Sequence, residues 1–104
     1  MPEPRVAHNV FFQLNDNTPA ARQTLLDACK KYLTGHPGEV FFAVGLRGEA
    51  FNRSVNDHDW DVGLHIVFQT KGDHDRYQDA ERHVKFIEEN KANWRKVRVF
   101  DSLI

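Results

Sequence analysis

The chain has 104 residues, 40% of them hydrophobic, which predicts one domain spanning residues 1–104 with a modest core. Charged residues make up 28% and the formal net charge is −1, which excludes the strong basic excess of most nucleic-acid-binding domains and the charge imbalance of a disordered tail. A single cysteine excludes an internal disulfide bond, and no apolar stretch is long enough to cross a membrane. We therefore expect a cytoplasmic protein with no membrane or nucleic-acid partner.

The first predicted element is a β-strand over residues 6–14, because every second residue there lies on one largely apolar face. That face also carries one histidine, His8. A helix is predicted next, with Thr18 as its N-cap and Pro19 at its first position. Apolar residues recur in it at helical spacing, and Cys29 is among them. We therefore expect Cys29 to be a small buried residue rather than a nucleophile.

The rest of the chain contains three further predicted strands and a second helical segment. The strands lie within residues 38–48, 61–70 and 94–102, and residues 76–91 form the helical segment between the last two. The order strand, helix, strand, strand, helix, strand predicts a ferredoxin-like α+β fold. In this fold a four-stranded antiparallel sheet has both helices on one face.

The two faces of the predicted sheet differ in composition. Each of the first three strands has a nearly pure apolar face, expected to lie under the helices. On the second strand that face carries Val40, Phe42, Val44 and Leu46. The opposite face of the sheet is mixed and carries Asn9, Phe11, Phe41, His65, Val67 and Phe100. A half-aromatic face without a covering helix is typical of an interface, so we expect a homodimer with its sheets face to face.

Several segments, taken in order, resemble the stress-responsive dimeric A/B barrel (Dabb) family over about residues 5–102. They are VAHNVFFQL, the strand with Gly45, DVGLHIVF, Tyr77 and His83 followed by Phe86, and the closing VRVFDS. The resemblance implies a ferredoxin-like domain that pairs into a dimeric α/β barrel. It also implies a role in stress responses, in a family whose members mostly have no assigned activity.

One relative in that family is a plant polyketide cyclase, which closes a linear polyketone by an intramolecular aldol reaction. Its catalytic histidine and tyrosine have the same six-residue separation on the second helical segment. The resemblance implies that His83 is a general base and Tyr77 its hydroxyl partner. It also matches His8 to a further histidine of the cyclase, whereas the cyclase's pocket histidine on the third strand aligns with Val62.

The geometry of residues 76–91 decides whether Tyr77 and His83 can meet. On a straight helix, residues six apart point about 120° away from each other. A break near residues 80–82 would instead turn His83, Phe86 and Ile87 inward together. No proline or glycine forces such a break, so the residues leave both arrangements open, and the resemblance favours the break.

His8 is the only ionisable residue on the apolar faces of the first three strands. Burying an imidazole there costs free energy unless a helical tyrosine, a helical histidine or a ligand hydrogen bonds to it. We therefore expect a pocket between sheet and helices for a small, hydrophobic, oxygenated ligand. Tyr77 and His83 are its candidate catalytic pair, and the expected ligand-binding residues are His8, Val10, Phe12, Val62, Phe68 and Ile87. Alternatively, Tyr77 is a core aromatic, His83 a helix-boundary residue and His8 a satisfied core histidine.

The loop NDHDWD, residues 56–61, has residue types that can bind a divalent metal. It lacks calcium-loop spacing, and its asparagine and aspartates favour a solvated turn, so no metal site is expected. No cofactor is expected either. A related barrel superfamily includes haem-linked and quinol monooxygenases, in which His8 or His83 could be an axial ligand, but nothing in the sequence demands it.

Two classes of function remain open from the sequence. The first is a homodimeric protein that binds a small molecule. If such a protein is an enzyme, we expect a cofactor-independent cyclase, lyase or isomerase that acts on a carbonyl compound. The second is a stress-associated dimer that acts by binding or structure alone. A cavity between His8, Tyr77 and His83 would favour the first class, and a packed core there would favour the second.

Overall fold

The computed structural model describes residues 3–104 and contains four strands and three α-helices. Their bounds are β1 (Val6–Leu14), α1 (Pro19–Tyr32), β2 (Glu39–Leu46), β3 (Val62–Phe68), α2 (Lys71–Asp79), α3 (Glu81–Asn90) and β4 (Trp94–Leu103), with the 3-10 turn η1 (Lys91–Asn93) before β4. The predicted order of strands and helices is confirmed, except that the second helical segment is two helices. No helix within residues 3–104 has the length and apolar character needed to cross a membrane.

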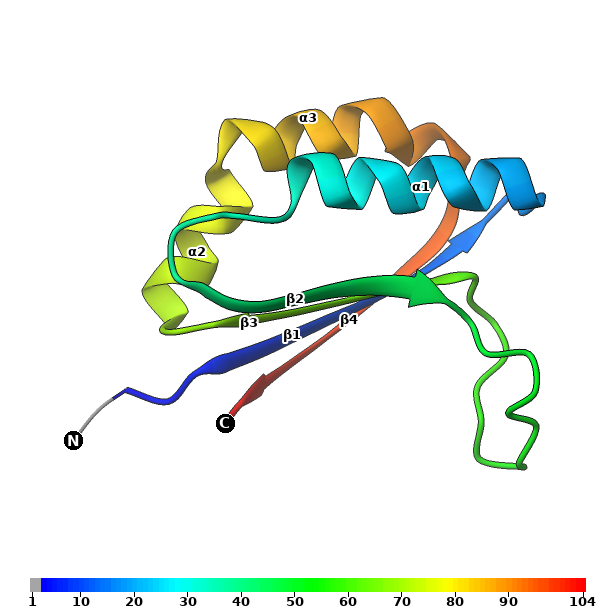
Figure 1. Cartoon of the computed structure of the whole chain (residues 1–104), viewed down its shortest axis with the longest axis horizontal. Coiled ribbons are helices and arrows are strands. Elements are labelled where there is room, and N and C mark those ends of the chain that lie inside the picture. The colour runs from blue at the N-terminus through cyan, green and yellow to red at the C-terminus, as the bar shows by residue number, and fades with distance from the viewer. Residues whose placement is uncertain (1–2) are drawn as a thin grey trace.

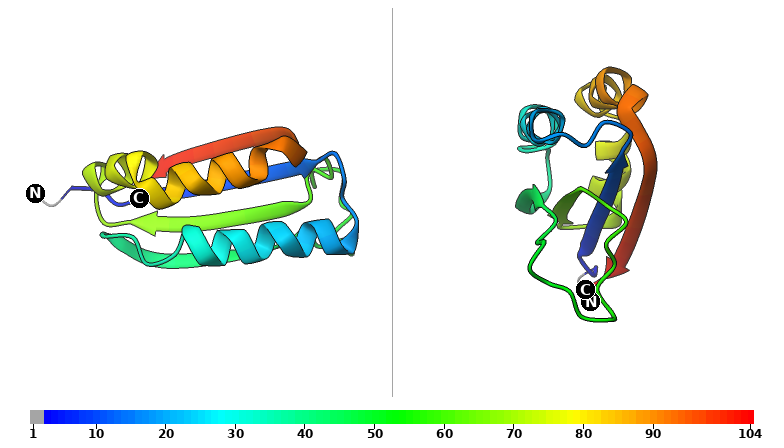
Figure 2. Two further views of the ribbon diagram at one scale, coloured as in Figure 1. Left: turned by 90° about the horizontal axis from the view of Figure 1, so that it is seen from above. Right: turned by 90° about the vertical axis from the view of Figure 1, so that its right-hand side faces the viewer.

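The strands form one antiparallel sheet in the order β2-β3-β1-β4. All three helices lie on one face of this sheet (Figure 1). Seen from above, α1 runs along the β2 side of the sheet and α3 along the side of β1 and β4 (Figure 2). The ferredoxin-like fold expected from the sequence is therefore confirmed.

The core lies between the helices and the central strands β1 and β3. Alternate residues of β1 are buried from Val6 to Leu14, as its pattern predicts, and His8 is among them. The prediction for β2 is wrong in part, since Val40 and Leu46 are 46% and 50% exposed. The register shifts between Glu39 and Phe41, and β2 is an edge strand, so the helices cover only the middle of its apolar face.

The start of α1 follows the sequence prediction. Thr18 is the N-cap, its hydroxyl accepts a hydrogen bond from the Ala21 N–H at 3.3 Å, and Pro19 is the first helical residue. The next helical segment begins at Lys71, five residues earlier than expected. The Thr70 hydroxyl accepts a hydrogen bond from the Asp73 N–H at 3.1 Å and so caps α2.

The helical segment breaks at Ala80, whose backbone is extended with φ −64° and ψ 143°. Tyr77 and Phe86 are nine residues apart, so on one straight helix they would point about 180° away from each other. Both side chains are only 2% exposed. The break lets α2 bury Tyr77 and α3 bury Phe86 against the same sheet face, which answers the question left open by the sequence.

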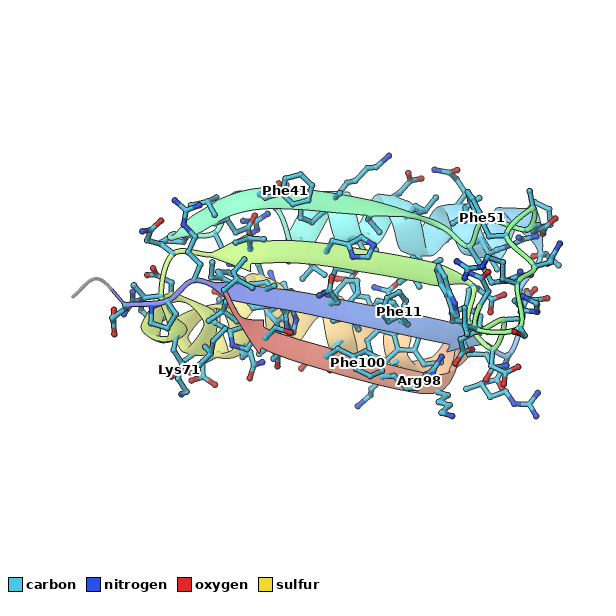
Figure 3. All side chains as sticks on the ribbon, turned by 90° about the horizontal axis from the view of Figure 1, so that it is seen from below. Phe11, Phe41, Phe51, Lys71, Arg98 and Phe100 are labelled. Atoms are coloured by element: carbon cyan, nitrogen blue, oxygen red, sulfur yellow. The ribbon has the colours of Figure 1, made fainter. Side chains whose placement is uncertain are left out.

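No helix within residues 3–104 covers the other face of the sheet (Figure 3). Phe11 and Phe100 lie side by side on it, with ring centroids 5.9 Å apart, and Phe41 lies on the β2 edge. Phe41 and Phe100 are more than half exposed. His65 lies on the same face and contacts the Asn9 side chain at 2.7 Å. The predicted mixed, partly aromatic face is therefore present.

Candidate small-molecule pocket

A cavity of about 280 Å³ lies between the sheet and helices α2 and α3. Six of the eight predicted site residues line it, namely His8, Val10, Phe12, Tyr77, His83 and Ile87. The structure places Val62 and Phe68 in the packed core instead, where both are fully buried and neither lines the cavity. His8, Tyr77 and His83 therefore all border the same cavity.

Tyr77 and His83 meet because of the break at Ala80. Their ring centroids are 4.7 Å apart, and the rings meet edge to face at 66°. The Nδ1 atom of His83 is buried and has no hydrogen-bond partner among residues 3–104. Such an atom costs free energy until a partner reaches it, so it is a ready contact point for a ligand.

The surroundings of the pair set its protonation. Burial lowers the pKa of His83, and the nearby imidazoles of His8 and His36 lower it further. Burial also raises the pKa of the Tyr77 hydroxyl. At neutral pH His83 is therefore an uncharged potential base, and Tyr77 a protonated potential hydrogen-bond donor.

His8 has the partners that its burial requires. Its Nδ1 lies 2.6 Å from Asp101 Oδ1 on β4 and 3.1 Å from His74 Nε2 on α2. The sequence predicts a helical tyrosine, a helical histidine or a ligand as its partner, and His74 is such a helical histidine. The main partner, Asp101, was missed, although the antiparallel register of β1 and β4 places it directly opposite His8.

Other residues on the cavity wall were also missed. They are Leu33, Leu64, Gln78, Phe86, Trp94, Val97 and Val99. Trp94 is the most informative, because its indole Nε1 is buried without a hydrogen-bond partner in the part of the chain that the structure describes. Its position opposite Leu14 at the start of β4 depends on a register shift that no sequence pattern indicates.

Two aspartates of the loop after β2 contact different strands. The Asp57 carboxylate accepts a hydrogen bond from Arg98 at 2.7 Å, and the Asp61 carboxylate accepts one from the Leu14 N–H at 2.8 Å. These two side chains hold the loop against β4 and β1. The contacts of these two carboxylates are therefore structural.

Solved structures similar to this chain share its fold at low sequence identity. A Dabb family protein from Mesorhizobium loti is 22% identical with a TM-score of 0.81, and the match covers 98% of each chain. A dimeric ferredoxin-like protein of unknown function from Thermobifida fusca is 16% identical with a TM-score of 0.79, over 98% of this chain and 92% of that one. A hydroxynitrile lyase from Passiflora edulis is 15% identical with a TM-score of 0.79, over 99% and 95%.

A search of curated proteins gives no significant match to the sequence. The family model of the stress-responsive A/B barrel domain matches residues 6–104, which is nearly the whole chain. Its match agrees with the ferredoxin-like architecture and with the resemblance noted in the sequence. The chain therefore belongs to the stress-responsive A/B barrel domain (Dabb) family.

Proposed function

We propose that this protein binds a small, hydrophobic, oxygenated molecule in the cavity between its sheet and helices α2 and α3. The observation that carries the proposal is the buried Nδ1 of His83, which has no partner within residues 3–104 and lies on a mostly apolar wall. In one imidazole tautomer a ligand hydroxyl would donate a hydrogen bond to this Nδ1, and in the other a ligand carbonyl or hydroxyl oxygen would accept one from it. The Tyr77 hydroxyl is a further potential hydrogen-bond donor to such a ligand. Apolar parts of the ligand would contact Val10, Phe12 and Ile87.

A thermal-shift and titration screen of aryl ketones, phenols and short acyl compounds tests this proposal. We expect at least one compound to raise Tm, because a ligand that binds only the folded state stabilises it. His83→Ala and Tyr77→Phe should each weaken that binding by roughly tenfold, the loss expected for one hydrogen bond.

Tyr32→Phe is the matched control for this screen. The Tyr32 hydroxyl donates a hydrogen bond to Glu89 at 2.6 Å, and Tyr32 does not line the cavity. Its loss should leave ligand affinity unchanged. Equal affinity in all four proteins would place the ligand elsewhere, and a screen without binders would favour the dimer that acts by structure alone.

A second candidate function is proton abstraction beside a carbonyl group, as in a cyclase, lyase or isomerase that needs no cofactor. The opposite pKa shifts of His83 and Tyr77 favour it, since they keep the imidazole unprotonated and the phenol protonated. The structural similarity to a hydroxynitrile lyase supports this candidate only in that another protein with this fold is an enzyme. Deuterium exchange at the α-carbon of a bound ketone tests it directly.

We also infer that the chain acts as a homodimer whose two sheets pack through their open faces. The exposed aromatic residues on that face and the dimeric state named for the Thermobifida fusca protein support this. The cavity lies on the opposite side of the sheet, under the helices, so each protomer would keep its own pocket.

A further inference from the structure

Three side chains that can bind a metal come together at one end of the cavity. They are His8 of β1, His74 of α2 and Asp101 of β4. Each offers one ligand atom, and these three atoms lie within 4.8 Å of one another. Both histidines are buried, while the Asp101 carboxylate is 41% exposed. The group combines two imidazoles with one carboxylate, a common donor set for catalytic zinc.

The fold holds these residues in place from three directions. The register of β1 and β4 sets Asp101 opposite His8. His74 lies three residues before Tyr77 on α2, so both side chains are on the helix face that packs on the sheet. The Thr70 cap fixes the start of that helix. None of the three side chains is therefore on a free loop.

Two ring nitrogens and a carboxylate oxygen converge here, and hydrogen bonds can pair them only two at a time. The Nδ1 atom of His8 is 2.6 Å from Asp101 Oδ1 and 3.1 Å from His74 Nε2. When that Nδ1 carries a hydrogen and donates it to the carboxylate, it cannot also accept one from His74. A cation among the three atoms would accept a lone pair from each of them at once.

The spacing of the atoms suits a small cation. With Zn–N and Zn–O distances of about 2.0–2.2 Å, ligand atoms of a tetrahedral site lie about 3.3 to 3.5 Å apart. The separations of His74 Nε2 from His8 and from Asp101 are 3.1 and 4.0 Å, on either side of that value. When a metal replaces the hydrogen, the 2.6 Å contact of His8 with Asp101 must widen by roughly 0.7 Å, and the 4.0 Å separation of His74 from Asp101 must shorten by roughly 0.5 Å.

A route from solvent and a further ligand are also present. A second pocket of about 280 Å³ is lined by His74, Gln78 and Asp101, and Gln78 also lines the main cavity. The Gln78 amide nitrogen lies 3.0 Å from His74 Nε2, and amide oxygen and nitrogen can exchange places by rotation. A cation could enter from this second pocket and take the amide oxygen or water as its fourth ligand.

We propose that His8, through Nδ1, His74, through Nε2, and Asp101 bind one divalent cation of the zinc type at the boundary of the two pockets. The sequence alone predicts no metal site, because His8, His74 and Asp101 lie far apart along the chain and no spacing pattern connects them. The proposal concerns metal binding and does not depend on the ligand or the chemistry of the main cavity.

Calorimetric titration of Zn²⁺ into the chelator-treated full chain is the test. We expect one cation per chain with a Kd in the micromolar range or tighter. His74→Gln and Asp101→Asn should each weaken binding by at least about tenfold, because each removes one strong ligand. The control is His58→Gln, which removes an exposed histidine from the loop before β3 and should leave the affinity unchanged.

Ring-nitrogen NMR of the 15N-labelled wild-type chain gives a result that does not depend on how the variants fold. Zn²⁺ should shift the signals of His8 Nδ1 and His74 Nε2 specifically. Absence of binding, shifts confined to His58 or His65, or an equal affinity for His74→Gln and His58→Gln would each overturn the proposal. If the chain binds a small molecule in the main cavity but does not bind Zn²⁺, the proposed function stands and the metal site is wrong. The two proposals can therefore be tested independently.

Discussion

At the scale of single residues, the cavity holds two histidines with different surroundings. The Nδ1 of His8 already contacts Asp101 and His74, so it has little freedom to exchange a proton with a ligand. The Nδ1 of His83 has no partner within the described chain, and the Tyr77 ring is next to it. If the site abstracts a proton, we therefore expect His83 rather than His8 to be the base.

This assignment predicts a pH profile for deuterium exchange at the α-carbon of a bound aryl ketone such as acetophenone, followed by NMR. The base is the neutral imidazole, and burial lowers the pKa of His83 from its ordinary value of 6.5. The exchange rate should therefore fall as the pH decreases, with a midpoint below pH 6.5. His83→Ala should lower the plateau roughly a hundredfold or more, whereas a midpoint at or above 6.5 would contradict the assignment.

The sequence predicted only part of this site. His8 stood out because it interrupts an apolar face, and Tyr77 and His83 were identified through the family resemblance. Asp101 was not identified, because its position opposite His8 depends on strands at the two ends of the chain. His74 could have been found from its helical spacing to Tyr77, but α2 was expected to begin after it.

At the scale of elements, the break at Ala80 has the backbone of a normal N-cap without its side chain. Thr18 at the start of α1 has φ −59° and ψ 157°, and Ala80 before α3 has φ −64° and ψ 143°. Thr18 caps its helix through its hydroxyl, whereas α3 has no side-chain cap. The first turn of α3, which carries His83, is therefore less stabilised than that of α1.

Ala80→Ser should correct this difference. A serine hydroxyl at that backbone geometry can accept a hydrogen bond from the backbone N–H of His83. The substitution should raise the free energy of unfolding by about 0.5–1 kcal/mol. Thr18→Ala is the reverse experiment and should lower it by about 1 kcal/mol. Urea denaturation measures both changes, and a loss of stability in Ala80→Ser would show that the break is not an independent N-cap.

Side-chain burial was easier to predict for the central strands of the sheet than for a strand at its edge. The central strands β1 and β3 have covered apolar faces, so alternation in the sequence matches burial. The edge strand β2 has a register shift, and Val40 and Leu46 are exposed despite their favourable pattern. The helix break at Ala80 arises from burying both Tyr77 and Phe86, a tertiary requirement with no proline or glycine to mark it.

At the scale of the whole molecule, one layer of helices covers only one side of the sheet. Phe100 is 52% exposed on the uncovered side, and the Phe11 ring contacts Phe100, Trp60 and His65 there. A 104-residue domain buries only a modest apolar area on folding. A second sheet that covered these rings would therefore add to its stability.

Phe100→Glu tests whether this face is the dimer interface. We expect the wild-type chain to elute with twice the 12.1 kDa mass of one chain in light-scattering chromatography. The variant should elute as a monomer, because a carboxylate would be buried against an apolar partner face. Val84→Glu is the matched control, since Val84 is 42% exposed on α3, on the helical side of the molecule. A dimer that survives Phe100→Glu but dissociates with Val84→Glu would place the interface on the helices and leave the open sheet face without a partner.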